Sequence, residues 1–262
     1  MYDAFSSDYD RFVNWPGRLA FELSFITKQL QTLTTPVGRP LRLLDAACGT
    51  GMHVIALAQQ GYKVAGADLS APMIERAQTN AATAGVGVLW AAIGFGKLSR
   101  TFGKTALFPF DGLFCLGNSL PHLLTEKDLV LTLADFCACL HPGGMLLLQN
   151  RNFDAVMPTH ERWMEPQSHH EGTSERIFLR FYDYDPDGLL SFNILTLKRE
   201  SGGDWHQQVT TTRLRPLLQA ELIEALSAVG FDEIACFGGL IGSLFDPKTS
   251  GNLVVVARLR GK

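Results

Sequence analysis

A strand-like run that ends in a glycine-rich turn is the feature that most limits the folds open to this chain. Residues 41–53 read LRLLDAACGTGMH, in which apolar residues lead into small ones and two glycines, Gly49 and Gly51. A helical pattern of apolar residues begins directly afterwards and stops at Gly61. Backbone freedom between a strand and a helix is typical of α/β proteins whose ligand approaches the main chain closely. We therefore expect a ligand site at this turn.

Strand and helix patterns alternate through the first half of the chain, which predicts a Rossmann-like, doubly wound α/β sheet covered by helices. A helix and a strand over 219–237 and a last strand at 252–259 bring the expected sheet to about seven strands. The other expected strands cover 41–47, 62–69, 86–93, 110–117 and 144–153, and the helices cover 16–33, 52–60, 71–84 and 126–140.

The alternation is interrupted in the second half of the chain. Three segments of alternating polarity, 175–185, 189–200 and 205–217, are joined by the turn sequences PDG and SGGD. This pattern predicts a small antiparallel sheet inserted into the domain. The predicted parts are an N-terminal helical lid at 1–40, a Rossmann-like domain at 41–153 and 216–262, and an inserted substrate-side subdomain at 154–215.

Composition narrows the possible functions. The net charge is −3, which does not favour a nucleic-acid-binding face. No apolar run reaches the length of a membrane span, and the start, MYDAFSSDYD, lacks the basic region of a signal peptide. The five cysteines lack the spacing of a disulfide framework or a metal site. We therefore expect a cytoplasmic protein with reduced thiols and no bound metal.

Asp68 lies 19 residues beyond Gly49, at the expected end of the second strand. An acidic side chain at this position can accept hydrogen bonds from the ribose hydroxyls of an adenosine. Both dinucleotides and S-adenosylmethionine (SAM) contain such a ribose. The third glycine of the dinucleotide fingerprint is replaced here by Val54. The pattern therefore favours SAM over a pyrophosphate-containing cofactor.

The stretch DAACGTG resembles motif I of class I SAM-dependent methyltransferases, and GADLS resembles their second motif. The resemblance implies that Ala47, Gly49 and Gly51 line the methionine part of SAM. It also implies that Asp68 holds the ribose.

The same resemblance places Leu69 and Ile93 beside the adenine. Many members of this class carry an acid near the adenine amino group, whereas Gly94 stands there in this chain. A backbone contact or another side chain is then needed in its place. The complete predicted cofactor site comprises Arg18, Asp45, Ala47, Gly49, Gly51, Asp68, Leu69, Met73, Ile93 and Leu116.

Two further stretches, GNSLPHL at 117–123 and RNFD at 151–154, resemble the glycine/sarcosine N-methyltransferase group. The resemblance is clearest over 41–154. It implies that Arg151 binds the substrate carboxylate and that Asn118 helps to place the amine. A guanidinium can hold a carboxylate with two parallel hydrogen bonds. Phe153 stands where relatives carry tyrosine, which removes one hydroxyl from the expected pocket.

Three features near the predicted pocket leave alternatives open. His122 is either a general base or a packing residue. The N-terminal segment, in which Arg18 is expected to reach the SAM carboxylate and Tyr9 to pack over the ligands, either closes as a lid or simply docks on the sheet. Aromatic residues of 175–185 either form a wall of the pocket or pack within their sheet. The predicted catalytic residues are Asn118, Arg151, His122 and Tyr9.

These patterns predict a SAM-dependent methyltransferase that methylates the amine of a small molecule, such as glycine or sarcosine, and releases S-adenosylhomocysteine. Two alternatives stay open. The chain also resembles enzymes that methylate nucleotide-linked amino sugars, and a SAM-binding protein without catalytic activity is possible. We expect no nucleic-acid or membrane partner, and the sequence leaves the oligomeric state open.

Overall fold

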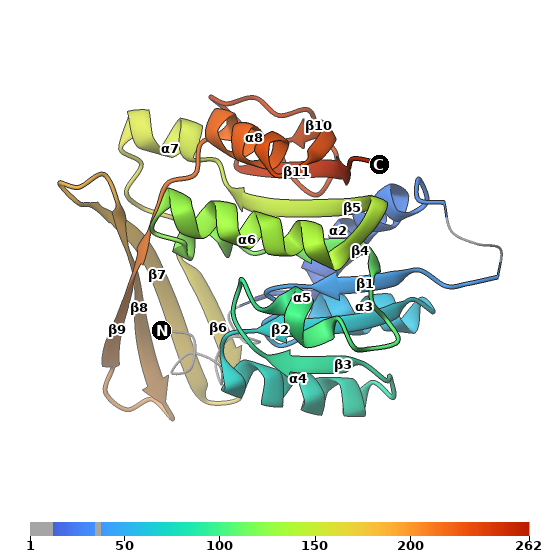
Figure 1. The fold of residues 1–262 in the computed structure, drawn as a ribbon. Helices are drawn as coiled ribbons and strands as arrows, with labels where there is room; N and C mark the ends of the chain where they lie inside the picture. The colour runs from blue at the N-terminus through green and yellow to red at the C-terminus, as the bar shows by residue number, and fades with distance from the viewer. Residues whose placement is uncertain (1–12, 35–37, 262) are drawn as a thin grey trace.

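The computed structural model describes residues 13–34 and 38–261, which form two β-sheets and the helices packed around them (Figure 1). The helices are α2 (Trp15–Leu30), α3 (Met52–Gln59), α4 (Ala71–Thr83), α5 (Leu98–Phe102), α6 (Glu126–Cys139), α7 (Phe153–Thr159) and α8 (Gln219–Ala228). The strands are β1 (Arg42–Asp45), β2 (Lys63–Asp68), β3 (Leu89–Ala92), β4 (Phe110–Cys115), β5 (Leu140–Arg151), β6 (Gln167–Glu171), β7 (Ser174–Tyr184), β8 (Leu190–Glu200), β9 (His206–Leu214), β10 (Phe231–Phe237) and β11 (Asn252–Leu259).

The large sheet has the strand order β10-β11-β5-β4-β1-β2-β3. Strands β3, β2, β1, β4 and β5 are mutually parallel, whereas β11 runs antiparallel to both β5 and β10. The prediction of a Rossmann-like sheet of about seven strands is confirmed. Because the chain runs outward from β1 to β3 and then returns to β4, the order reverses between β1 and β4. Ligands of open α/β sheets bind at the carboxyl ends of strands beside such a point.

Helices cover both faces of the large sheet, with α2, α3 and α4 on one face and α5, α6 and α8 on the other. Successive residues of a strand point to opposite faces, so Leu43 packs with α2 and α3 whereas Leu44 packs with α6 and α8. Every residue of β4 is buried for the same reason. This two-sided burial explains why the central strands read as almost continuous apolar runs.

The second sheet is antiparallel, in the order β6-β7-β8-β9, and it lies beside the carboxyl edge of the large sheet (Figure 1). The sequence predicted its three longer strands, and the structure adds β6. This strand reads QSHHE and is mostly exposed, so it lacks an apolar alternation. It is held by main-chain pairing with β7, which the polar sequence does not reveal. His169 and His170 belong to this strand.

Helix α5 was also not predicted, because its stabilising contacts come from a distant part of the chain. Lys97 precedes the helix and provides no side-chain cap. Instead the carboxylate of Asp135, on α6, accepts hydrogen bonds from the main-chain N–H groups of Leu98 (2.8 Å) and Ser99 (3.0 Å). A cap supplied from another helix leaves no local sequence signal.

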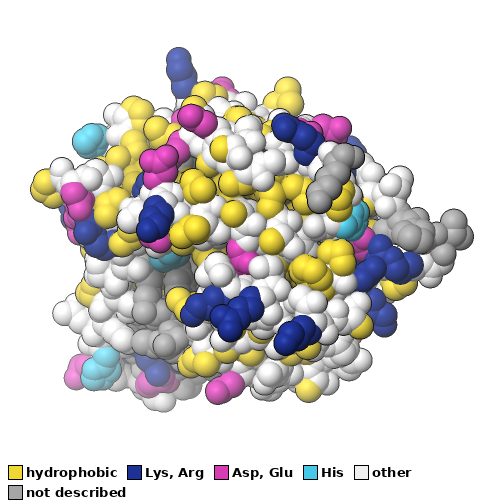
Figure 2. Space-filling model, in the orientation of Figure 1, with side chains coloured by type: hydrophobic (Ala, Val, Ile, Leu, Met, Phe, Trp, Pro, Cys, Tyr) yellow, Lys and Arg dark blue, Asp and Glu magenta, His cyan; other side chains and the backbone are white. Residues whose placement is uncertain are grey.

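The surface of the described chain is mixed in charge. Figure 2 shows acidic and basic side chains interspersed with apolar ones on the face that it presents. None of the helices described for residues 13–34 and 38–261 is long and apolar enough to cross a membrane. Within the same ranges, no group of three or more His, Cys, Asp or Glu side chains is arranged to hold a metal ion.

Candidate active site

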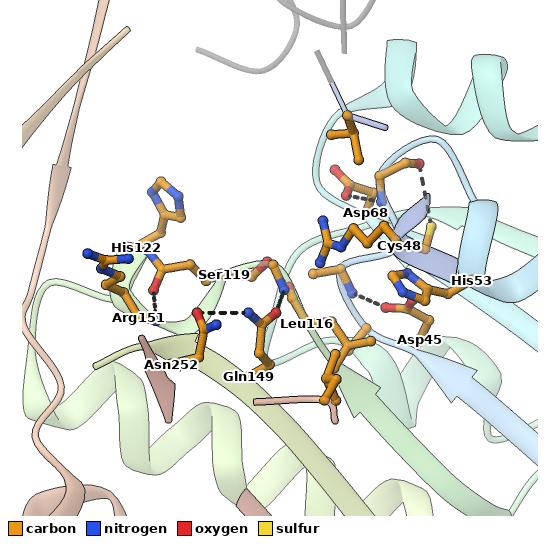
Figure 3. A pocket seen from close by; sticks show the side chains of 18 of the residues that line it. Asp45, Cys48, His53, Asp68, Leu116, Ser119, His122, Gln149, Arg151 and Asn252 are labelled. Atoms are coloured by element: carbon orange, nitrogen blue, oxygen red, sulfur yellow. Dashed lines mark hydrogen bonds between the residues drawn. The ribbon is translucent and has the colours of Figure 1, made fainter. Parts of the chain in front are cut away.

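A cavity of about 1,070 Å³ lies at the carboxyl edge of the large sheet, between α2 and the inner side of the second sheet. Figure 3 shows that its labelled side chains form two groups. Asp45, Cys48, His53 and Asp68 make one group, here called the Asp68 end. Ser119, His122, Gln149, Arg151 and Asn252 make the other, here called the Arg151 end.

The Asp68 end is built on the glycine-rich turn after β1. Both carboxylate oxygens of Asp68 accept main-chain hydrogen bonds, one from Gly49 (2.9 Å) and one from Ser70 (2.9 Å). Gly49 has a φ of +53°, a left-handed conformation that favours glycine. The turn is therefore held against the end of β2. Because a carboxylate offers about four acceptor positions, Asp68 can also accept from a ligand.

Gly51 and Ile93 are the two described members of the predicted cofactor site that do not line the cavity. Gly51 has a φ of +81°, and a Cβ atom added there would lie 2.6 Å from Cη2 of Trp90. A Cβ atom added to Gly66, on β2, would lie 2.4 Å from Cζ3 of the same indole ring. Ile93 packs against the core. In the structure Gly51 serves close packing of α3, and the cofactor contacts predicted for it and for Ile93 stay predictions.

Asp45, at the end of β1, is buried and lines the cavity. Burial raises the pKa of its carboxyl to about 6, although the nearby His53 and the main-chain N–H of Ala47 favour the charged form. Cys48 is also buried at this end, and burial raises the pKa of its thiol well above the usual value. A protonated, enclosed thiol is a packing group and not a nucleophile.

Arg18 lines the cavity from α2 and donates a hydrogen bond from Nε to Oε1 of Glu22 (2.7 Å). The other oxygen of Glu22 lies 2.6 Å from Nε2 of His53 on α3. Burial opposes the ionisation of Glu22, but His53 and Arg18 outweigh it and hold the pKa of Glu22 below its usual value. The chain of contacts ties α2 to α3. The sequence analysis did not single out Glu22 or His53, although the spacing of Arg18 and Glu22 is that of a helical ion pair.

Other predicted cofactor residues lie around the same end. Ala47, Leu69, Met73 and Leu116 all line the cavity. Leu69 is 81% exposed on its wall, which gives an apolar surface suited to a flat base. Gly94 lies against it, since a Cβ atom there would approach Cδ1 of Leu69 to 3.1 Å.

At the Arg151 end, hydrogen bonds of side-chain amides join the loop after β4 to the end of β5. Asn118 adopts a left-handed φ of +65°, and its Oδ1 accepts from the main-chain N–H of Arg151 (2.9 Å). Gln149 accepts from the N–H of Gly117 (2.8 Å) and donates to Oδ1 of Asn252 (3.2 Å). The structure thus brings the predicted pair Asn118 and Arg151 together. Gln149 and Asn252 were missed, because Asn252 is distant in sequence and no local pattern marks it.

The guanidinium of Arg151 faces the cavity and donates from Nη2 to Oε2 of Glu161 (2.9 Å). Its Nε is buried and has no hydrogen-bond partner within the described part of the chain. His122 also lines the cavity, and burial lowers the pKa of its imidazole to about 4. The ring is therefore neutral at neutral pH. Tyr9, the remaining predicted catalytic residue, lies outside the described residues.

The second sheet closes the Arg151 end. Arg180 and Tyr182 of β7 line the cavity, as do Phe192 and Ile194 of β8. Burial raises the pKa of the Tyr182 hydroxyl to about 12, so this ring stays neutral. Of the aromatic residues predicted for this wall, Phe178 is instead fully buried.

The fold is similar to those of solved SAM-dependent methyltransferases. A SAM-dependent methyltransferase from Clostridium acetobutylicum matches over 99% of both chains with a TM-score of 0.76 and 16% identity. SAM-bound CalS10, an amino pentose methyltransferase from Micromonospora echinaspora, matches over 98% of this chain and 96% of its own, with a TM-score of 0.72 and 22% identity. Residues 43–144 match the family model described as a methyltransferase domain. The fold is therefore that of a class I SAM-dependent methyltransferase.

Relatives identified by sequence show which family of methyltransferases the chain belongs to. A glycine/sarcosine N-methyltransferase from Halorhodospira halochloris is 34% identical over 155 residues, which are 59% of this chain but only 54% of the relative. One from Aphanothece halophytica is 30% identical over 237 residues, which are 90% of this chain and 81% of the relative. The chain belongs to the family of SAM-dependent glycine/sarcosine N-methyltransferases. SAM is its cofactor, and the carboxylate of Asp68 beside the Gly49 turn fits the ribose and methionine parts of that molecule.

Proposed function

We propose that this protein transfers the methyl group of SAM to the amine of a small amino acid such as glycine or sarcosine. The observation that carries the proposal is Arg151. Its guanidinium faces the cavity opposite the Asp68 end and already pairs with a carboxylate, that of Glu161. A substrate carboxylate has the same chemistry, and the relatives named for glycine and sarcosine support this choice.

The Asp68 end would hold the cofactor. Asp68 would accept from the ribose hydroxyls, Leu69 would lie against the adenine, and Arg18 would pair with the carboxylate of the methionine part. Asp45 would face the ammonium of the same part. When bound, SAM supplies an electrophilic methyl group on a positively charged sulfur. The domain boundaries at 40, 153 and 215, and a lid function of residues 1–40, form part of this proposal.

The Arg151 end would hold and aim the acceptor. Two parallel hydrogen bonds from a guanidinium fix the orientation of a carboxylate as well as its position. Asn118 would direct the amine along the line of methyl transfer, using a second lone pair of the oxygen that already accepts from Arg151. Orientation of this kind supplies about 7–11 kcal/mol of barrier lowering in well-aligned reactions.

The reaction needs a neutral amine, and the charge moves from sulfur to nitrogen as the new bond forms. His122, with a pKa of about 4 caused by burial, is too weak a base to hold a proton from an ammonium at neutral pH. We therefore assign His122 to packing. The acceptor would lose its proton to solvent before it enters, and the neutral ring of Tyr182 would face the developing cation.

The test is release of S-adenosylhomocysteine from SAM with glycine, sarcosine and dimethylglycine offered in parallel. Turnover on one amine but not on the next identifies the acceptor and the number of methyl groups added. In the Arg151→Ala variant we expect kcat/KM to fall roughly 30- to 900-fold, since removing one partner of a buried charge contact costs about 2–4 kcal/mol.

Arg162→Ala is the matched control, because Arg162 pairs with Asp183 (2.7 Å) and does not line the cavity. Equal activity of both variants would contradict the assignment of Arg151. Turnover only on a nucleotide-linked amino sugar would replace the amino-acid acceptor by the second acceptor class. SAM binding without turnover on any amine would support a non-catalytic protein.

We further propose a reducing compartment, the cytoplasm, as the place of this activity. All five cysteines are described, and none forms a disulfide. Free, buried thiols are usual for proteins kept in a reducing environment.

A further inference from the structure

The contact between Arg151 and Glu161 places a carboxylate of the protein on the group that is proposed to bind the carboxylate of the acceptor. Nη2 of Arg151 and Oε2 of Glu161 are 2.9 Å apart. Arg151 lines the cavity, whereas Glu161 does not. We propose that Glu161 is a specificity-determining residue that competes with the acceptor carboxylate for Arg151. This inference rests on the proposed function.

The main chain of Glu161 is fixed by two elements. Helix α7 ends at Thr159, and the next residue, His160, takes a left-handed φ of +50° that turns the chain. The ring of His160 stacks on Tyr184 of β7 with centroids 4.7 Å apart. The hydroxyl of Tyr184 then donates to the carbonyl oxygens of Val156 (3.2 Å) and Glu161 (3.0 Å). These contacts hold the main chain of Glu161 in a defined position beside Arg151.

The carboxylate of Glu161 can move away from Arg151, although the main chain of Glu161 is held in place. Its side chain is 49% exposed, and that of Arg151 is 31% exposed. An ion pair with this much exposure is weak, because water solvates both charges. Displacing Glu161 into solvent therefore costs little. Glu22, which pairs with Arg18 at the other end of the cavity, is only 6% exposed and is also bound by His53.

Glu161 acts on the acceptor in two ways. Nη2 carries one N–H on each edge of the guanidinium that can hold a carboxylate by two parallel hydrogen bonds. The bond to Glu161 occupies one of these N–H groups and so removes one edge from the acceptor. The negative charge of Glu161 also repels an incoming carboxylate. Both effects weaken the binding of a carboxylate acceptor and leave the binding of a neutral acceptor unchanged. The effect falls on KM and not on the methyl-transfer step.

Glu161→Gln tests the proposal, because it removes the charge and keeps the size of the side chain. For the amino acid that the enzyme methylates, we expect a KM about two- to fivefold lower than in the unchanged protein. This change corresponds to about 0.4–1 kcal/mol, within the range measured for exposed ion pairs. We expect kcat and the Kd of SAM to stay the same. Glu165→Gln is the matched control, because it removes the same charge from an exposed position four residues further on.

Acetate gives a second measurement that does not depend on turnover. It has the carboxylate of the acceptor but no amine, and its binding to the full chain loaded with S-adenosylhomocysteine is followed by calorimetry. We expect Glu161→Gln to bind acetate two- to fivefold more tightly. A KM and an acetate affinity that do not change would overturn the inference.

An increase in KM and weaker acetate binding would also overturn it, because Glu161 would then orient Arg151 for the acceptor. Failure of the proposed function gives a different result. In that case no amino acid is methylated, while acetate still binds more tightly to Glu161→Gln than to the unchanged protein.

Discussion

The two ends of the cavity hold charged groups by different means. At the Asp68 end, the key residues come from one stretch of chain around β1 and β2, and Asp45 and His53 are only 4% and 6% exposed. At the Arg151 end, residues come from the loops after β4 and β5, the start of β11 and the second sheet. The central ion pair there is about a third to a half exposed. The charged groups at the Asp68 end are therefore packed more closely than those at the Arg151 end, and under the proposed function SAM would bind the more closely packed of the two.

The largest expected effect tests the difference in packing between the two ends by adding one methyl group near each of them. Gly51→Ala places a Cβ atom 2.6 Å from Trp90 at a φ of +81°. Left-handed strain and overpacking together are expected to lower the free energy of unfolding by about 2–4 kcal/mol. Urea denaturation measures this loss.

Gly117→Ala is the counterpart at the Arg151 end, with a φ of +73° and no atom within 4 Å of the new Cβ. Only the strain applies there, so the expected loss is about 1–2 kcal/mol. Equal losses in the two variants would show that the Asp68 end is no more tightly packed than the Arg151 end.

The second prediction concerns SAM affinity. Asp68→Asn keeps the volume of the side chain but replaces one acceptor oxygen by a donor that opposes the main-chain N–H of Gly49 or Ser70. A hydrogen bond to a charged group is worth about 1.5–3 kcal/mol, so we expect the Kd of SAM to rise roughly 10- to 150-fold. Isothermal titration calorimetry measures it.

The control for this change is Asp154→Asn on α7. Asp154 also accepts a main-chain hydrogen bond, from Gln219 (2.9 Å), but it does not line the cavity. We expect its Kd for SAM to match that of the unchanged protein. A similar loss in both variants would mean that Asp68 acts through folding and not through the cofactor.

The third and smallest effect is a pH dependence at Asp45. Its pKa of about 6 in the folded chain lies above the ordinary value of 3.8, because burial favours the neutral form. Between these two values the folded state binds more protons than the unfolded state, so this group's contribution to stability falls as pH rises from about 4 to about 6. The ammonium of bound SAM would favour the charged form.

SAM binding should therefore weaken as pH falls below 6. Between pH 7.5 and pH 5.5 we expect the Kd of SAM to rise roughly fourfold, as half or more of the carboxyl groups take up a proton. Titrations at several pH values measure the change. Asp45→Asn should show no such step, and a step that persists in this variant would assign it to another group.

The sequence predicted most of the Asp68 end of the cavity but only part of the Arg151 end. The Gly49 turn and Asp68 were found because spacing along one strand–turn–helix unit records their chemistry. Helix α5 and strand β6 were missed because Asp135 and the main chain of β7 supply their stabilising contacts from elsewhere. Asn252 reaches the Arg151 end through tertiary structure alone, because β11 pairs with β5. Residues of a site can be predicted from spacing when they are close in sequence. Residues that are distant in sequence can be placed in a site only when the three-dimensional structure is known.

The second sheet leaves and rejoins the methyltransferase domain at almost one point. The N–H of Gln219, where α8 begins, donates to Asp154, which is 65 positions earlier. The main-chain N–H of Arg215 donates to the carbonyl oxygen of Pro121 (2.7 Å). A segment whose two ends meet can be lengthened, shortened or exchanged between relatives without moving the ends it joins. We therefore expect that the second sheet can be exchanged between relatives without disturbing the large sheet, and that such an exchange would alter the acceptor.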